Sequence, residues 1–149
     1  MPIDSTRSKA IAEGFTLGKQ VTFPTPYLGL FTTMPGTDGT GGVETNYPEY
    51  SRVKLNSTGV EGKIIMANAV IEAGTGDDAG KNIAVSKNQE IVYFPEAETG
   101  AGGTVVGIGL FSALTGGTPY MWKPLEKAMT INQNSVPMFR IGKFAVKVK

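Results

Sequence analysis

The sequence predicts an all-β protein of antiparallel strands with one short helix near its N-terminus. Of the 149 residues, 20 are glycine and nine are proline, and neither type follows a collagen-like period. They therefore mark turns, and many turns in a short chain favour short strands over helices. Apolar residues make up 40% of the chain and charged residues 18%, a composition typical of a globular protein with a buried core.

The expected architecture is a single domain over residues 1–149. Residues 5–17 form the helix, and residues 21–149 form an antiparallel β-sandwich, for which a jelly roll is one arrangement of the strands. Strands are expected at residues 27–33, 50–55, 64–72, 91–94, 104–113, 120–122 and 139–148, with polar loops at 35–42 and 74–82.

The predicted helix, STRSKAIAEGFTL, has capping signals at both ends. Asp4 or Ser5 can cap its first turn, and Gly18 can end it. Ile11 and Phe15 are four residues apart, so they lie on one face. This narrow apolar stripe predicts a helix that lies on a sheet or on a neighbouring subunit.

Three details of the strands can be predicted from residue parity. Between Tyr50 and Leu55 the pattern alternates, which places Arg52 on the face opposite Leu55 in a half-buried strand. Glycines at positions 107 and 109 leave room on one face for a bulky side chain or another backbone. Near the C-terminus the apolar residues change from odd to even positions, which predicts a β-bulge near Gly142-Lys143.

Composition excludes several kinds of site. The chain has no cysteine and no histidine, so disulfides, thiolate nucleophiles, histidine bases and almost all zinc sites are ruled out. The net charge is +1, and only Lys143, Lys147 and Lys149 cluster, so we expect no nucleic-acid binding. No apolar run is long enough to cross a membrane, and the N-terminus lacks the pattern of a secretory signal.

The remaining polar motifs do not form a catalytic constellation. The carboxylate pairs Asp77-Asp78 and Glu96/Glu98 read as solvated loop charge rather than as glycosidase acids. Ser8-Lys9 and Ser86-Lys87 are the only adjacent Ser–Lys pairs, and neither lies in a nucleophile motif. The glycine-rich loops lack the spacing of calcium or phosphate sites. We therefore expect no enzyme activity, no metal and no cofactor.

The aromatic residues allow a second interpretation, a carbohydrate-binding module. Tyr27, Phe31, Phe94, Phe111, Tyr120 and Trp122 could together form a stacking platform, but Phe31, Phe94 and Phe111 read as core. Tyr120 and Trp122 share a parity on a short strand and are the better candidates for surface aromatics. If they, or Tyr47 and Tyr50, line an exposed groove, the chain can stack sugars of a host glycan.

An ordered set of motifs gives a resemblance to a known family. It comprises Phe15-x-x-Gly18, the strand 27–33, Tyr50-Ser51-Arg52-Val53, Phe94-Pro95-Glu96-Ala97, the segment 103–113 and Thr115-Gly116-Gly117. In this order the motifs resemble those of small virion proteins of tailed bacteriophages, of the tail-fibre, head-fibre or capsid-decoration type. The resemblance covers roughly residues 5–148, and Ser112 stands where the family commonly has an aspartate.

The resemblance implies a non-enzymatic structural subunit, repeated on the virion after assembly in the host cytoplasm. Two placements stay open: on the capsid, as a head-fibre or decoration protein, or in the tail fibre. The expected partners are other virion proteins and further copies of the chain, in a homotrimer. Ile11 and Phe15 are the residues we expect to contact another subunit. Binding of a host glycan is the alternative function.

Overall fold

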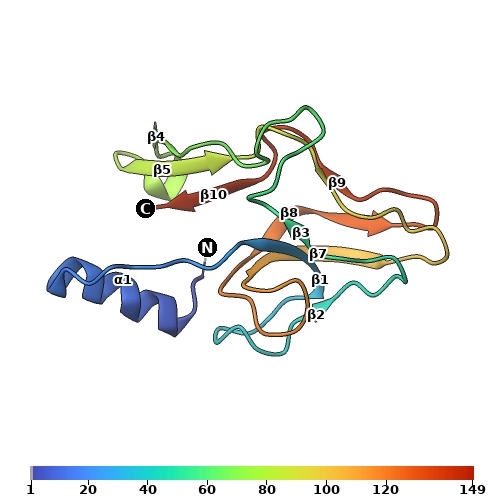
Figure 1. Ribbon diagram of the computed structural model, residues 1–149, viewed down its shortest axis with the longest axis horizontal. Coiled ribbons are helices and arrows are strands. Elements are labelled where there is room, and N and C mark those ends of the chain that lie inside the picture. The colour runs from blue at the N-terminus through green and yellow to red at the C-terminus, as the bar shows by residue number, and fades with distance from the viewer. Residues whose placement is uncertain (1) are drawn as a thin grey trace. The chain divides into compact units, whose positions relative to one another are not determined.

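Antiparallel strands make up most of the regular structure in the computed structural model, which describes residues 2–149 (Figure 1). In chain order the elements are α1 (Ser5–Leu17), β1 (Tyr27–Thr33), β2 (Val43–Glu44), β3 (Val53–Lys54), β4 (Val70–Ala73), the 3-10 turn η1 (Gly76–Asp78), β5 (Asn82–Lys87), β6 (Val92–Tyr93), β7 (Gly103–Phe111), β8 (Met121–Ile131), β9 (Met138–Phe139) and β10 (Ala145–Val148). The predicted class, all-β with one short N-terminal helix, is confirmed.

The helix α1 has the predicted bounds because its ends are specified locally. The Asp4 side chain accepts a hydrogen bond from the Arg7 backbone N–H at 2.7 Å and so caps the first turn. At the other end Gly18 has a φ of 65°, a left-handed conformation that suits glycine and ends the helix.

The strands and loops divide into two compact units, each described here by itself. The first comprises residues 2–54 and 94–137. Its sheet has the order β2-β1-β7-β8, and β3 also pairs with β1. The register sets Leu28 opposite Leu110 and Leu30 opposite Ile108, and all four residues are buried. They form one layer of the core of this unit.

The other face of that sheet holds an aromatic cluster of Phe31, Phe111 and Trp122. Room for these rings comes from Gly109 of β7, because a Cβ there would lie 2.5 Å from an atom of the Phe31 ring. Gly107 faces the sulfur of Met34 in the same way. The prediction that these two glycines admit bulky side chains is confirmed.

The second unit comprises residues 55–93 and 138–149. It contains a three-stranded sheet of order β10-β5-β4 and the pair β6-β9. Its buried Asn88 donates to the carbonyls of Glu90 and Arg140 at 2.8 and 3.0 Å, and its Oδ1 accepts from the Phe144 N–H at 2.9 Å. These bonds satisfy a buried amide and fix the chain between β9 and β10.

The predicted β-bulge near Gly142-Lys143 is wrong. Those residues form a turn in which the Lys143 N–H donates to the Arg140 carbonyl at 2.9 Å, with Gly142 at a φ of 74°. The turn separates β9, which pairs with β6, from β10, which pairs with β5. The change of parity therefore reflects two strands rather than one irregular strand.

Several predicted strands have other bounds in the structure. The expected strand at 50–55 is reduced to β3, and that at 64–72 is reduced to β4. The strand expected at 120–122 extends to Ile131 as β8, while β2 and β5 had no predicted counterpart. The single-domain and jelly-roll expectations stay predictions. No helix among residues 2–149 is long and apolar enough to cross a membrane.

Candidate functional site

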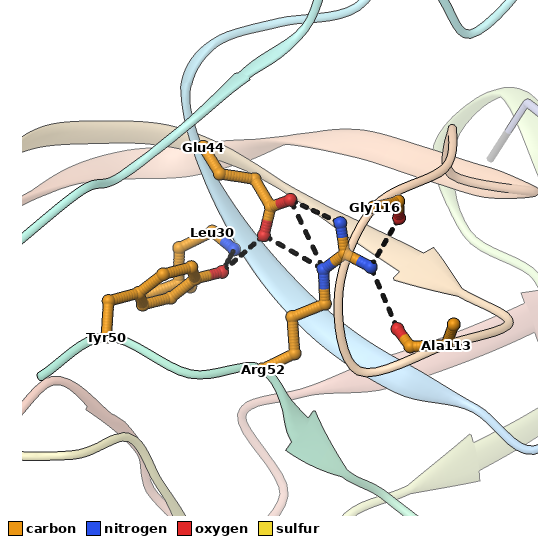
Figure 2. A network of polar contacts seen from close by, with 6 residues as sticks. All are labelled: Leu30, Glu44, Tyr50, Arg52, Ala113 and Gly116. Atoms are coloured by element: carbon orange, nitrogen blue, oxygen red, sulfur yellow. Dashed lines mark hydrogen bonds and ion pairs between the residues drawn. The ribbon is translucent and has the colours of Figure 1, made fainter.

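An ion pair between the buried Arg52 and the half-buried Glu44 is the centre of the main polar network in the first unit (Figure 2). The Arg52 Nη2 lies 2.5 Å from Glu44 Oε1, and its Nε donates to both carboxylate oxygens at 3.1 and 3.2 Å. The remaining nitrogen, Nη1, donates to the carbonyls of Ala113 and Gly116 at 2.8 and 2.9 Å. The guanidinium is thus held on both sides, although Arg52 is only 7% exposed.

The Arg52 guanidinium also stacks on an aromatic ring. Its carbon Cζ lies 3.4 Å from the centroid of Phe111, a cation–π contact. This approach depends on Gly29 of β1, because a Cβ there would lie 2.7 Å from the Phe111 ring and 2.8 Å from Glu44 Oε2. The glycine therefore makes the space in which the ion pair and the ring meet.

Tyr50 completes the network. Its hydroxyl donates to Glu44 Oε2 at 2.7 Å and accepts from the Leu30 N–H at 3.0 Å (Figure 2). Burial, followed by the hydrogen bond to Glu44, raises the pKa of Tyr50 well above its ordinary value. The ring stacks on Phe94, with centroids 6.3 Å apart and planes 11° apart. Tyr50 is thus a neutral hydrogen-bonding link between β1 and β2.

Tyr47 supports the same region. Its ring meets Tyr50 edge-on, with centroids 5.5 Å apart, and its hydroxyl donates to the Pro95 carbonyl at 2.8 Å. Burial raises the pKa of Tyr47 to about 12. Both tyrosines therefore act as fixed parts of the fold at neutral pH.

The hydrogen bonds of Arg52 connect separate loops to the sheet. They tie β2, the residues before β3 and the loop that follows β7 (residues 112–120) to one side of the sheet. Removing one partner of a buried ion pair is strongly destabilising, because the other charge is left uncompensated. In residues 2–149, no group of three or more acidic, histidine or cysteine residues could hold a metal ion.

The predicted surface aromatics, Tyr120 and Trp122, are buried, and that prediction is wrong. Tyr120 is 6% exposed and lies under the Arg7 guanidinium, whose Cζ is 5.3 Å from the ring centroid. Trp122 is 4% exposed and belongs to the aromatic cluster. Tyr47 is buried as well, at 2%. Tyr50, the fourth aromatic residue named for the carbohydrate interpretation, is half-buried, so three of the four residues are buried and form no exposed groove.

The predicted contact residues Ile11 and Phe15 lie on α1, in which none of the residues Ser5–Leu17 is buried. Ile11 is half-buried, whereas the side chain of Phe15 is 88% exposed. Leu17 and, beyond the helix, Phe23 are also exposed, at 65% and 54%. An apolar group is thus available for a subunit contact, which itself stays a prediction.

The candidate catalytic pairs are engaged elsewhere or open to solvent. Asp78 forms ion pairs with Lys149 at 2.8 Å and Lys81 at 3.5 Å. The Ser86 hydroxyl donates to the Ala67 carbonyl, while Lys87 pairs with Glu72. Glu96 and Glu98 are exposed, and Lys9, next to Ser8, pairs with Glu13 at 3.8 Å.

Sequence reasoning missed the Arg52–Glu44 pair, although it quoted Tyr50-Ser51-Arg52-Val53 as a family motif. The alternation of residues 50–55 placed Arg52 on an outer face, and no pattern in the sequence pointed to Glu44. The available signal was the place of Arg52 in the motif, between Ser51 and Val53, which share the face of Leu55. Because Arg52 is buried, the motif has a structural role. Tyr50 and Arg52 both donate hydrogen bonds to the carboxylate of Glu44.

Comparison with known families supplies the affiliation. The family described as "Podophage GP4 fiber I protein gp80" matches residues 3–147 of the chain. The chain belongs to this family. The resemblance to phage virion proteins of the fibre type is therefore confirmed, and the protein is a structural component of a bacteriophage virion. No curated protein matches the chain.

Proposed function

We propose that the chain is a non-enzymatic subunit, present in many copies in a virion fibre, that attaches to a neighbouring virion protein through α1. The observation that carries this proposal is the exposure of the helix. None of the residues Ser5–Leu17 is buried, and the large side chain of Phe15 is 88% exposed.

The physical argument concerns the stability of α1. An isolated helix of fewer than about 12–15 residues is marginal in water, and helices in proteins gain most of their stability from packing. The 13 residues of α1 have local caps but no buried side chain. A partner that covers Phe15 and Leu17 would supply the missing packing, because burying one such side chain contributes roughly 1.5–3 kcal/mol.

The rest of the first unit suits a rigid structural subunit. The Arg52 guanidinium holds the loop at residues 112–120 through two carbonyls, which fixes an exposed glycine-rich segment. Rigid loops lose less conformational entropy when they meet a partner. The family description supports placement in a fibre. We propose that the copies assemble as a homotrimer. The fibre can attach either to the capsid or to the tail, and both placements belong to the proposal.

The test is cryo-electron microscopy of the intact particle, with the chain traced in the map. We expect density for the chain in a fibre, with α1 packed against another protein. Density on the capsid would make the chain a head-fibre component, and density on the tail a tail-fibre component. Absence from the particle, or a helix open to solvent in every copy, would contradict the proposal.

A pair of matched variants tests the contact itself. Phe15→Asp should reduce incorporation into particles, because the charge cannot be buried at an apolar interface. Val60→Asp is the control, since Val60 is 82% exposed and lies outside α1. Equal incorporation of the two variants would rule out attachment through Phe15.

A further inference from the structure

The three-stranded sheet of the second unit has two outer strands of opposite character, β10 and β4 (Figure 1). On β10, Lys147 is exposed, and Lys149 follows directly after the strand. Lysine on an outer strand discourages pairing with other chains. The sequence of β4 is Val-Ile-Glu-Ala, which contains neither lysine nor proline, and its register with β5 runs without a bulge. Only β10 therefore carries this protection.

The free side of β4 presents backbone hydrogen-bonding groups. The Gly74 N–H donates to the Lys81 carbonyl at 2.8 Å, while the Lys81 N–H donates to the Asp78 carbonyl, so Gly74 and Lys81 form one half of a hydrogen-bonded pair at the end of the β4-β5 ladder. Because such pairs alternate in antiparallel strands, Val70 and Glu72 direct their backbone groups toward β5. Ile71 and Ala73 then direct theirs outward, where no strand of residues 2–149 pairs with β4.

The side chains of β4 are suited to covering by another strand. Val70 is 55% exposed and Ile71 is 68% exposed, on opposite faces of the strand. The only charged residue, Glu72, pairs with Lys87 of β5 at 2.6 Å. This ion pair leaves the strand with little net charge to oppose an identical strand.

We infer that β4 of one copy pairs in antiparallel fashion with β4 of a second copy, around a two-fold axis at Ile71. The inference rests on the proposed function, which requires several copies of the chain in one fibre. Each Ile71 then lies opposite the same residue of the second copy, and Val70 lies opposite Glu72. Two sheets of three strands join into one of six.

This register follows from charge and exposure. An axis at Glu72 would set two carboxylates directly opposite each other, which is unfavourable. An axis at Ile71 separates them and covers the most exposed apolar side chain of the strand. Both copies pair through the same strand. A second copy therefore forms hydrogen bonds with the outward backbone groups of Ile71 and Ala73, and no other protein is needed. The contact is two-fold, so it can link the proposed trimers but does not form them.

Single-cysteine variants test the register, because the natural chain contains no cysteine. At an axis on Ile71 the two Cα atoms are about 5.5 Å apart, a separation that a disulfide can span. Ile71→Cys should therefore give a disulfide-linked dimer on mild oxidation. Val70→Cys is the matched control, because its Cα atoms would lie about 8 Å apart, beyond disulfide reach. No dimer from Ile71→Cys, or equal dimer from both, would overturn the inference.

Light scattering of the full chain tests the contact without cross-linking. Ile71→Lys should have half the molar mass of the wild-type protein at the same concentration, because a buried lysine opposes its own copy. Val148→Lys is the control, since Val148 is 60% exposed on the other outer strand of the same sheet. We expect it to keep the wild-type mass. Equal masses for wild type and Ile71→Lys would overturn the inference.

The particle map separates this inference from the proposed function. Copies of the chain in a fibre with separate β4 strands would overturn only the β4 pairing. A dimer that cross-links at Ile71 but is absent from particles would overturn only the proposed function. Another virion protein on the free side of β4 would also overturn the pairing.

Discussion

The Arg52 guanidinium lies over the Phe111 ring, with its Cζ 3.4 Å from the ring centroid, while it binds Glu44 and two loop carbonyls. The two residues are 59 positions apart, and β1 lies between β7, which carries Phe111, and β3, which directly follows Arg52. Arg52 therefore connects segments that are distant in the sequence, and its loss should affect them together.

Replacing Arg52 by methionine should lower the free energy of unfolding by about 3–5 kcal/mol. The change leaves the carboxylate of Glu44 without its counter-charge, and such breaks in buried ion pairs cost about this much. Denaturant unfolding followed by circular dichroism measures the loss. Glu44→Gln is the comparison variant: it keeps the side-chain volume and one acceptor oxygen but leaves the buried guanidinium of Arg52 without its counter-charge, so we expect a loss of similar size. A loss below about 1 kcal/mol for Arg52→Met would show that the pair is not strongly stabilising.

Tyr50→Phe should destabilise the protein by about 1–3 kcal/mol, although it removes a single oxygen. The Leu30 N–H and Glu44 Oε2 both lose a partner, and a buried group left unsatisfied costs about this amount. The matched control is Tyr93→Phe, because Tyr93 is 42% exposed and should change stability by less than about 0.5 kcal/mol. Equal unfolding midpoints for the two variants would contradict the role given to the Tyr50 hydroxyl.

The helix and β1 could be predicted with their observed bounds because their signals are local. Asp4 and Gly18 act within one turn of the helix, and the apolar run at 27–33 needs no partner to be recognised. By contrast, β2 has two residues, too short for any period to show, and β3 keeps only two residues of the alternating segment 50–55. Both strands form because they pair with β1, a long-range contact that the sequence does not display.

The candidate site escaped prediction for a related reason. A half-buried alternating strand normally exposes its charged residues, so Arg52 was assigned to an outer face. Its burial depends on the ring of Phe111 and the absence of a side chain at Gly29, both from other strands. The shared parity of Tyr120 and Trp122 on a short strand likewise favoured a surface position, whereas Trp122 packs in the aromatic cluster and Tyr120 lies under the Arg7 guanidinium.

Gly109→Ala should destabilise the protein by about 1–3 kcal/mol through overpacking. The added methyl would lie 2.5 Å from the Phe31 ring, so the aromatic cluster must shift. Gly36→Ala is the control, since a methyl there would meet its nearest atom at an ordinary 3.5 Å. We expect that control to be neutral or stabilising by up to about 1 kcal/mol. Thermal unfolding of the two variants distinguishes these outcomes, and a stable Gly109→Ala protein would show that the cluster can adapt.

The attachment of the C-terminal residue should weaken at acid pH. The hydrogen bond from Lys149 is the main cause that lowers the pKa of Asp78 below its ordinary value of 3.8. A carboxyl with a lowered pKa in the folded state contributes stability that is present above the ordinary pKa. That stability is lost as the pH falls through the lowered value. Wild-type stability relative to Asp78→Asn should therefore decrease as the pH falls below about 4.

Urea unfolding of the wild-type protein and Asp78→Asn, from about pH 7 to about pH 2, measures this difference. Asp77→Asn is the matched control, because Asp77 is the adjacent residue and makes neither of the two ion pairs of Asp78. Its difference from the wild type should vary less over the same range. A convergence of wild type and Asp78→Asn at low pH reports protonation of the Asp78 carboxyl. A difference that stays constant with pH would mean that the ion pairs of Asp78 add nothing to the stability of the fold.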